Sequence, residues 1–287
     1  MTRTLAKPAL PAGALGRLRS QLDFLSPSLR RVADFVLAQP EQVVYQTITE
    51  LATAAEVGEA SVTRLSHKLS FPGFHAFKLA LTADLAGQSQ DGGHGAAESL
   101  PEIVASAARQ AVAAVEDTRA IVDPLVAERA VKAVAAARRV DVTGQGHSAL
   151  AAEFLAQKLM RLGLTCVAHA DPHVAAVSAA TLPGDGVMIA FTRSGSTLDT
   201  IQNLRLARGT GAYTLAVTNR ASSPVTAHAD DVLFTASPEG PLSGGAISSL
   251  VSQLLVVEVL YLGVLKQLGH ADAALLKTAE AVVEKKV

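Results

Sequence analysis

The sequence predicts an α/β protein with two parts: an N-terminal all-α helix-turn-helix bundle and a C-terminal doubly wound parallel sheet of five strands. Three observations predict this class. Helix start and stop signals dominate residues 15–86, whereas short β-branched runs alternate with helical stretches from residue 140 onward. Hydrophobic residues make up 49% of the chain but aromatic residues only 4%, and a core of Ala, Val and Leu suits helices packed on a sheet.

The N-terminal helices are predicted from their ends. Pro27 suits the first turn of a helix that stops before Pro40. Residues 47–50 (Thr-Ile-Thr-Glu) form a capping box that starts a second helix. Gly58 breaks that helix, and helical periodicity resumes over residues 59–69. Two short helices joined by a tight glycine turn predict a helix-turn-helix.

The domain boundaries follow from composition. Residues 1–14 are expected to be a flexible leader, and residues 15–86 the helix-turn-helix domain. The glycine-rich residues 87–99 are predicted to be a linker. The larger domain then spans residues 100–287, beginning with an Ala- and Val-rich helical stretch over residues 100–137.

The larger domain contains the predicted sheet. Because buried strands alternate with helices, the sheet should be parallel, and its ligands should lie at the carboxyl ends of the strands. The predicted strands are residues 140–143, 165–168, 186–192, 213–218 and 231–235.

The charge is unevenly distributed. The formal net charge of −1 argues by itself against a nucleic-acid-binding protein. However, residues 1–83 carry nine Lys or Arg against six Asp or Glu, and the remainder carries 16 against 20. A small basic module joined to a larger, slightly acidic domain fits a DNA-binding protein with a second function.

The compartment is predicted from cysteine usage and hydropathy. The single Cys166 excludes an internal disulfide framework and a Cys-rich zinc site, and it indicates a reducing environment. The most apolar stretch, residues 250–268, is interrupted by Ser252, Gln253, Glu258 and Lys266, which argues against a membrane span. The first residues lack an apolar segment of signal-peptide length. We therefore expect a cytoplasmic protein without a membrane partner.

Two loops at predicted strand ends carry the chemistry. The first strand leads into Gly144-Gln-Gly-His-Ser148 and a helix, where glycines and free amides favour an anion. The third strand leads into Thr192-Arg-Ser-Gly-Ser-Thr197, which places four hydroxyls and a glycine at a second helix start. Hydroxyls and amides held in fixed directions suit a phosphate bound without a metal or cofactor. The loops therefore predict a site for a phosphorylated small molecule.

Other interpretations of these loops stay open. Ser and Thr at helix starts are common caps, so either loop alone could be structural. Residues 144–149 also satisfy the pattern G-x-G-x-x-A, and Asp171 lies near the distance of a ribose-binding acid, which would indicate a dinucleotide-dependent enzyme. That interpretation leaves the hydroxyl-rich second loop unexplained. His169 and His173 are four residues apart, but the intervening Pro172 disfavours a helical metal pair, and we expect no metal site.

The two loops resemble a known domain. Their pairing, with Gly-x-Gly-x-Ser at 144–148 and Ser/Thr-x-Ser-Gly-x-Thr at 192–197, resembles the phosphosugar-binding SIS domain of sugar isomerases. Residues 49–78, which include Thr49-Glu-Leu-Ala52, Ala60-Ser-Val-x-Arg64 and Lys68-Leu-x-Phe71-x-Gly73-Phe74, are similar to the helix-turn-helix of the RpiR family of bacterial transcription regulators. The departures from the usual family residues are at Gly58, Leu65, Ser70 and Thr192.

The resemblance implies a fold, a ligand and its site. The fold would be SIS-like with a flavodoxin-like strand order, and the ligand would be a sugar phosphate. Glu239 stands where SIS isomerases keep a proton-shuttling carboxylate, and in a regulator it would accept hydrogen bonds from sugar hydroxyls. The alternative is that Glu239 is an acid favoured by the dipole at the start of the last long helix. The expected effector-binding residues are Gly146, His147, Ser148, Thr192, Ser194, Gly195, Ser196, Thr197 and Glu239.

The DNA-binding residues are predicted from helical geometry. Ser61, Arg64 and Lys68 share one face of the second helix, opposite the apolar residues. Arg64 is the best candidate for a bidentate guanine contact, and the others suit phosphate contacts. The full predicted set is Thr47, Ser61, Thr63, Arg64, His67, Lys68 and Lys78.

The predicted function is a transcription regulator whose binding to double-stranded operator DNA is modulated by a sugar phosphate. We expect no catalytic residue and a homodimer or homotetramer, because small DNA-reading modules usually act in pairs. The alternative is an aldose–ketose sugar-phosphate isomerase that uses Glu239 or a histidine as its base. An enzyme would have no use for the basic helix-turn-helix.

Overall fold

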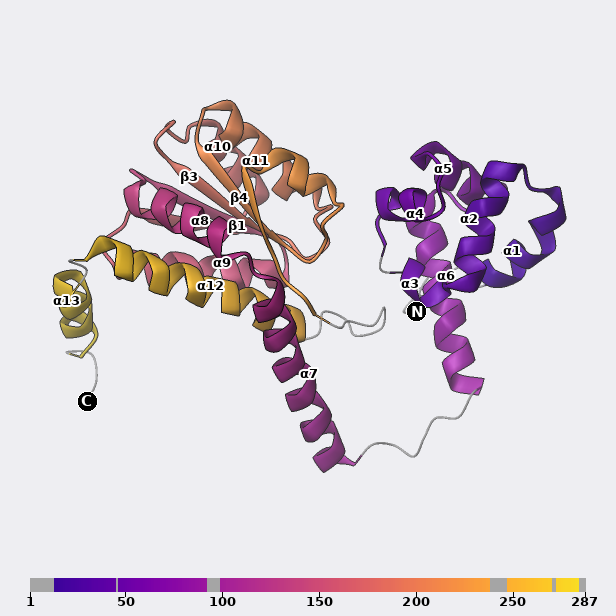
Figure 1. The fold of residues 1–287 in the computed structure, drawn as a ribbon, viewed down its shortest axis with the longest axis horizontal. Helices are drawn as coiled ribbons and strands as arrows, with labels where there is room; N and C mark the ends of the chain where they lie inside the picture. Colours follow the sequence, from indigo (N-terminus) through magenta and orange to yellow (C-terminus); the bar gives the residue numbers. More distant parts are fainter. Residues whose placement is uncertain (1–12, 45, 92–98, 238–246, 270–271, 284–287) are drawn as a thin grey trace, which may run out of the picture. The chain divides into compact units, whose positions relative to one another are not determined.

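The computed structural model of the chain describes residues 13–44, 46–91, 99–237, 247–269 and 272–283. Within them the chain divides into two compact units, one ending at Glu102 and the other beginning at Ile103. Each unit has its own hydrophobic core (Figure 1).

The N-terminal unit is helical over its described residues, as predicted. Its elements are α1 (Ala14–Gln21), the 3-10 turn η1 (Leu22–Phe24), α2 (Pro27–Ala38), α3 (Pro40–Val43), α4 (Ile48–Ala54), α5 (Glu59–Lys68) and α6 (Phe74–Asp91). Helix α6 includes Gly87, so the linker predicted from that residue begins inside a helix. Residues 92–98 lie outside the described part of the chain.

The predicted capping box is confirmed at the start of α4. The Thr47 hydroxyl accepts a hydrogen bond from the Glu50 amide at 3.1 Å, and the Glu50 carboxylate accepts one from the Thr47 amide at 2.7 Å. The turn that follows differs from the prediction. The left-handed φ of 52° belongs to Glu56, whereas Gly58 has a φ of −80° and open space at its Cβ position. Glycine at position 58 is therefore tolerated and not required.

The core of this unit holds α4 and α5 together. Leu51 of α4 and Val62 and Leu65 of α5 are almost fully buried, as is Leu69 at the C-cap of α5, as the helical spacing predicts. Phe71 packs edge-on against Phe77 beyond α5, with ring centroids 5.6 Å apart. This packing fixes α5 as a rigid helix whose opposite face is free to meet a partner.

The C-terminal unit alternates strands and helices. Its elements are α7 (Leu100–Ile121), α8 (Pro124–Ala136), β1 (Val140–Gly144), α9 (His147–Met160), β2 (Cys166–His169), α10 (Pro172–Ala180), β3 (Val187–Phe191), α11 (Leu198–Gly209), β4 (Tyr213–Thr218), η2 (Pro224–His228), β5 (Asp231–Phe234), α12 (Ile247–Leu268) and α13 (Asp272–Val283).

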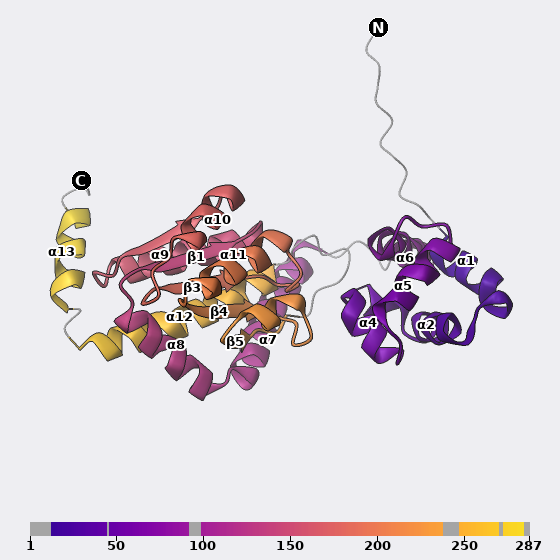
Figure 2. The same cartoon turned by 90° about the horizontal axis from the view of Figure 1, so that it is seen from above.

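The sheet has five parallel strands in the order β2-β1-β3-β4-β5, which confirms the predicted doubly wound, flavodoxin-like sheet. Successive residues of β3 alternate between two cores: Ile189 and Phe191 pack with α8, α9 and α12, and Met188 packs with α10 and α11. The sheet is thus covered on both faces (Figures 1 and 2). Burial on both faces explains why the strands read as continuous apolar runs.

Helix α12 contains the apolar stretch whose polar interruptions argue against a membrane span. By length and composition it is long enough to cross a membrane, but 44% of that window is buried inside the structure. Val256, Val257, Leu260 and Val264 belong to the core beneath the sheet. This buried part of α12 packs against α8 and α9.

Candidate functional site: two hydroxyl-bearing loops and a helix-turn-helix

The two predicted loops meet at one place in the sheet. Strands β1 and β3 are neighbours, and the chain leaves β1 toward α9 on one face and β3 toward α11 on the other. At such a switch point the loops diverge and leave a crevice at the carboxyl ends of the strands, which is where open α/β sheets bind ligands. The structure therefore brings residues 145–148 and 192–197 to a common edge.

The first loop owes its shape to two glycines. A Cβ on Gly144 would lie 2.5 Å from the Ser148 carbonyl oxygen, so only glycine allows α9 to start this close to β1. Gly146, at the N-cap of α9, has a φ of 58°, which side chains other than glycine rarely adopt. His147 is exposed at the first turn of α9, as its predicted ligand contact requires.

Ser148 is held by a residue that the sequence analysis missed. Its side chain is buried, and its Oγ accepts a hydrogen bond from Gln253 Nε2 of α12 at 3.0 Å. Because Gln253 donates, the hydrogen of the Ser148 hydroxyl remains available to an acceptor. In the sequence, Gln253 is recognisable only as a polar interruption of an apolar stretch. Because it lies far along the chain from either loop, nothing there indicates its contact with Ser148.

The second loop is folded around its own hydroxyls. Thr192 Oγ1 accepts from the Gly195 amide at 3.2 Å, and Ser194 Oγ accepts from the Ser196 amide at 3.3 Å. The Ser196 hydroxyl donates to the Ser194 carbonyl at 3.2 Å. Thr192 and Ser194 act here as acceptors, so each retains a hydroxyl hydrogen that can be donated to an anion.

Gly195 is required at the apex of this loop. Its φ of 63° is left-handed, and a Cβ there would collide with the side chain of Ser223. The loop is braced from β4 as well, because the Thr218 hydroxyl donates to the Arg193 carbonyl at 3.2 Å. The segments 217–219 at the end of β4 and 223–225 at the start of η2 thus contact the loop through Thr218 and Ser223.

The interpretation of these Ser and Thr residues as helix caps does not fit. Helix α9 begins after Gly146 and α11 after Thr197, and neither N-cap residue makes a side-chain capping bond. In the first turn of α9, the Ser148 and Ala149 amides donate to the Gln145 and Gly146 carbonyl oxygens at 3.2 and 3.1 Å, so the amides that can serve another acceptor are those of the first turn of α11. Together with the hydroxyls, they form a neutral set of donors that suits a phosphate group.

The other predicted features of this unit have separate outcomes. Glu239 lies outside the described residues. Asp171 caps α10 by accepting from the Val174 amide at 2.9 Å, and the strand order differs from that of the dinucleotide-binding fold. Among the residues described, no group of three His, Cys, Asp or Glu could hold a metal ion.

Burial and the Asp141 carboxylate raise the pKa of the Cys166 thiol to about 12, so this thiol is not a nucleophile.

On the N-terminal unit, α5 presents Arg64 to solvent. Its Nη2 donates to Ser61 Oγ at 3.1 Å. Ser61 itself is only 5% exposed, and its predicted contact with DNA stays a prediction. In the structure its hydroxyl accepts the hydrogen bond that supports the guanidinium of Arg64. Thr63 is half-buried beside it.

The remaining basic residues bond to backbone carbonyls. Lys68 Nζ donates to the Phe24 carbonyl at 2.6 Å, and Lys78 Nζ donates to the Gln46 carbonyl at 2.8 Å. His67 Nε2 lies 3.0 Å from the Pro72 carbonyl oxygen. An ammonium group has three donors, so the exposed Lys68 can still meet a phosphate. Thr47 remains in the capping box at the start of α4.

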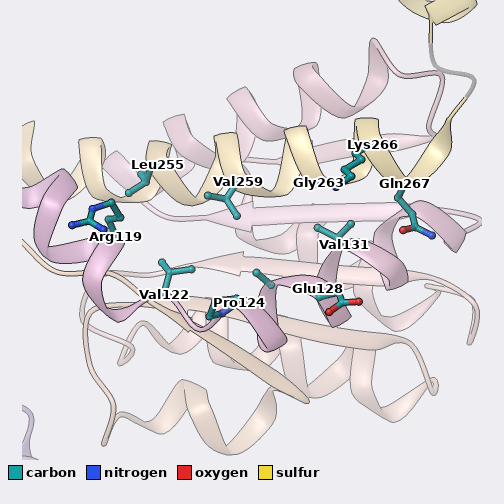
Figure 3. A pocket seen from close by; sticks show the side chains of 11 residues that line it. Arg119, Val122, Pro124, Glu128, Val131, Leu255, Val259, Gly263, Lys266 and Gln267 are labelled. Carbon is teal, nitrogen blue, oxygen red and sulfur yellow. The ribbon is translucent and has the colours of Figure 1, made fainter.

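A separate apolar groove lies between α8 and α12. It has a volume of about 650 Å3 and is lined by Val122, Val131, Leu255 and Val259, with Arg119 at one end and Lys266 at the other (Figure 3). The lining residues come from α8, from α12 and from the end of α7 with the turn that follows it.

Two family models match the chain. The helix-turn-helix domain of the rpiR family matches residues 12–88, and the SIS domain matches residues 133–263. The first match covers α1 to α6, and the second covers the whole sheet together with both hydroxyl-bearing loops.

Relatives and solved structures match the chain over most of its length or over its C-terminal part. An uncharacterized HTH-type transcriptional regulator of Haemophilus influenzae is 33% identical over 97% of this chain and 99% of its own length. The structure of the Vibrio vulnificus NanR protein complexed with ManNAc-6P has a TM-score of 0.85 at 33% identity, covering 96% of this chain and 99% of that one. The sugar isomerase domain of an RpiR transcription factor from Sphaerobacter thermophilus has a TM-score of 0.58 at 25% identity, covering 64% and 99%.

Proposed function

Because this chain belongs to the RpiR family of helix-turn-helix transcription regulators and carries a SIS domain, we propose that it binds operator DNA through α5 and that a phosphorylated sugar at the switch point modulates this binding. One observation carries the proposal. The loops after β1 and β3 bring Ser148 and Ser194 to one edge of the sheet, and both hydroxyls retain a hydrogen for an anion.

The ligand class follows from the donor set. Neutral hydroxyls and helix amides bind a phosphate reversibly, whereas a free sugar would lack the anion that they favour. NanR binds ManNAc-6P, and we take this compound as the first probe ligand for this chain. A thermal-shift screen of phosphorylated hexoses and amino sugars, each beside its unphosphorylated form, tests the class: only the phosphorylated members should raise the melting temperature.

Ser194→Ala is expected to weaken binding of the probe ligand by about 1.5–3 kcal/mol, the usual contribution of one hydrogen bond to a charged group. Calorimetric titration measures this loss. Apo operator binding should stay at the wild-type value, because Ser194 belongs to the C-terminal unit. Ser106→Ala on α7, which lies in neither loop, is the matched control. Equal ligand affinity in Ser194→Ala and wild type would rule out the assignment of this loop.

The catalytic alternative is an aldose–ketose isomerase, as in other users of the SIS fold. Isomerisation needs a base within reach of the sugar carbons, and among the described loop residues His147 is the one side chain of that kind. We propose that the chain is not an enzyme. Incubation with the probe ligand and with aldose phosphates should yield no ketose product, and turnover at ordinary enzyme rates would overturn this part of the proposal.

The remaining proposals concern the DNA side and the assembly. We propose that residues 15–86 form the DNA-binding domain and residues 100–287 the sensing domain, in a cytoplasmic protein. We propose that Arg64 contacts a base and that the surrounding polar residues contact the DNA backbone: Thr47, Thr63, His67, Lys68 and Lys78.

We also propose that the chain is a homodimer or homotetramer, because operators usually contain two half-sites. The apolar groove between α8 and α12 supports this proposal, since it offers a surface for a second copy of the chain.

A further inference from the structure

Helix α12 carries a row of buried polar side chains that the effector site does not by itself explain. Four neighbouring polar residues of this largely apolar helix are all less than 9% exposed: Ser248, Ser249, Ser252 and Gln253. Burying a hydroxyl or an amide costs free energy unless it is hydrogen-bonded. The partners of these side chains therefore indicate what the row connects.

One end of the row touches the proposed effector site. Gln253 Nε2 donates to Ser148 Oγ at 3.0 Å. A ligand that accepts the hydrogen of the Ser148 hydroxyl changes the strength of the hydrogen bond between Gln253 and Ser148. Because Gln253 is only 1% exposed, its side chain cannot replace this bond with one to water. Ligand binding at the first loop therefore acts directly on α12.

The neighbouring residue ties α12 to α7. Ser252 Oγ lies within hydrogen-bond reach of three carbonyl oxygens: Ala236 after β5, Ser248 at 2.9 Å, and Ala114 of α7 at 3.5 Å. A serine hydroxyl has one hydrogen and can satisfy one of these acceptors well at a time. Ser252 therefore has alternative arrangements of its bond, as a switching element requires.

Helix α7 is hydrogen-bonded to the same residue, Ala236, through the side chain of Thr118. Thr118 Oγ1 donates to the Ala236 carbonyl at 3.1 Å and accepts from the Ala236 amide at 3.0 Å. Thr118 and Ala114 are the buried residues of this 22-residue helix, so its attachment to the domain is narrow. In sequence, α7 is also the first helix after the residues that join the two units.

From these contacts we infer that α12 relays effector binding to α7: Gln253 senses the ligand through Ser148, and Ser252 passes the change to α7 through Ala236 and Thr118. The inference rests on the proposed function and assigns Gln253, Ser252 and Thr118 as positioning residues, since none of them touches the ligand. Ser248 Oγ, one turn before Ser252, is buried and has no partner among the described residues. The hydroxyl of Ser248 is thus available for a second arrangement of the hydrogen bonds around Ser252.

Thr118→Val tests the relay, because valine keeps the shape of threonine and removes its hydroxyl. On the full chain, the affinity for the probe ligand and the affinity for DNA without ligand should both stay near wild type. The ratio of DNA dissociation constants with and without ligand should move toward one by about 2- to 30-fold, the range for residues that alter coupling alone. Thr118→Ser retains the hydroxyl and should restore the wild-type ratio.

The matched control is Thr214→Val, which removes another fully buried threonine hydroxyl of the same domain, one that bonds to Asp230 and His228. It should leave the ratio unchanged. If Thr118→Val does not fold, Ser252→Ala breaks the same link from the α12 side. A wild-type ratio in Thr118→Val, or an equal loss in Thr214→Val, would overturn the relay. A wild-type protein whose DNA affinity ignores the ligand would instead refute the proposed function.

Discussion

Gly195→Ala is expected to abolish the response to a sugar phosphate, the largest effect that we predict for a single substitution in the C-terminal unit. A left-handed residue other than glycine costs about 1–2 kcal/mol, and the new Cβ would collide with Ser223. The loop must therefore move away from β4 and take Ser194 with it. Losing two hydrogen bonds to a charged group, at about 1.5–3 kcal/mol each, lowers ligand affinity by about 100-fold or more.

The measurement is a calorimetric titration of the folded variant with a phosphorylated sugar. Gly209→Ala is the matched control, because Gly209 ends α11 without a positive φ and with open space within 4 Å of the position that the new methyl group would take. That control should bind as tightly as the wild type. Wild-type affinity in Gly195→Ala would show that the geometry of this loop is not what holds the ligand.

Arg64→Ala is expected to have the largest effect on DNA. Arg64 is exposed on α5, and its guanidinium donates a hydrogen bond to the hydroxyl of the buried Ser61. A bidentate contact to a guanine contributes about 1–3 kcal/mol of discrimination. Operator affinity should therefore fall by roughly 5- to 150-fold, and the preference for one base at the contacted position should relax. A gel-shift titration against operator and single-base variants measures both quantities.

Two comparisons separate a base contact from simple charge. Arg19→Ala removes the same charge from α1 and should leave the base preference unchanged. Lys68→Ala should lower the slope of log affinity against log salt by about one, as the loss of one phosphate contact does, with little change in base preference. If Arg64→Ala keeps both the affinity and the preference of the wild type, α5 does not read the operator through this residue.

Local patterns were sufficient to predict most of the fold. The capping box at Thr47 and Glu50 and the β-branched runs of the five strands are encoded in adjacent residues, so their positions are confirmed to within one or two residues. Two local predictions were wrong. Helix α6 continues through Gly87, and the left-handed residue of the helix-turn-helix is Glu56, although glycine is the residue that usually marks a break or a left-handed turn.

The site was predictable only in part. Both hydroxyl-bearing loops are recognisable by their composition next to a strand end. The contacts that orient their side chains come from residues far along the chain: Gln253 bonds to Ser148, and Ser223 packs on Gly195. Likewise, the spacing of Ser61 and Arg64 places them on adjoining positions of α5, but only the packing of α5 on its neighbours shows that Ser61 is buried.

The most direct test of the account is the affinity of the full chain for its operator, measured alone, with the phosphorylated sugar that raises its melting temperature most, and with the same sugar lacking phosphate. We predict that the phosphorylated sugar changes the dissociation constant by about 5- to 150-fold, the usual range of allosteric coupling, and that the unphosphorylated sugar leaves it unchanged. An identical dissociation constant under all three conditions would contradict the account.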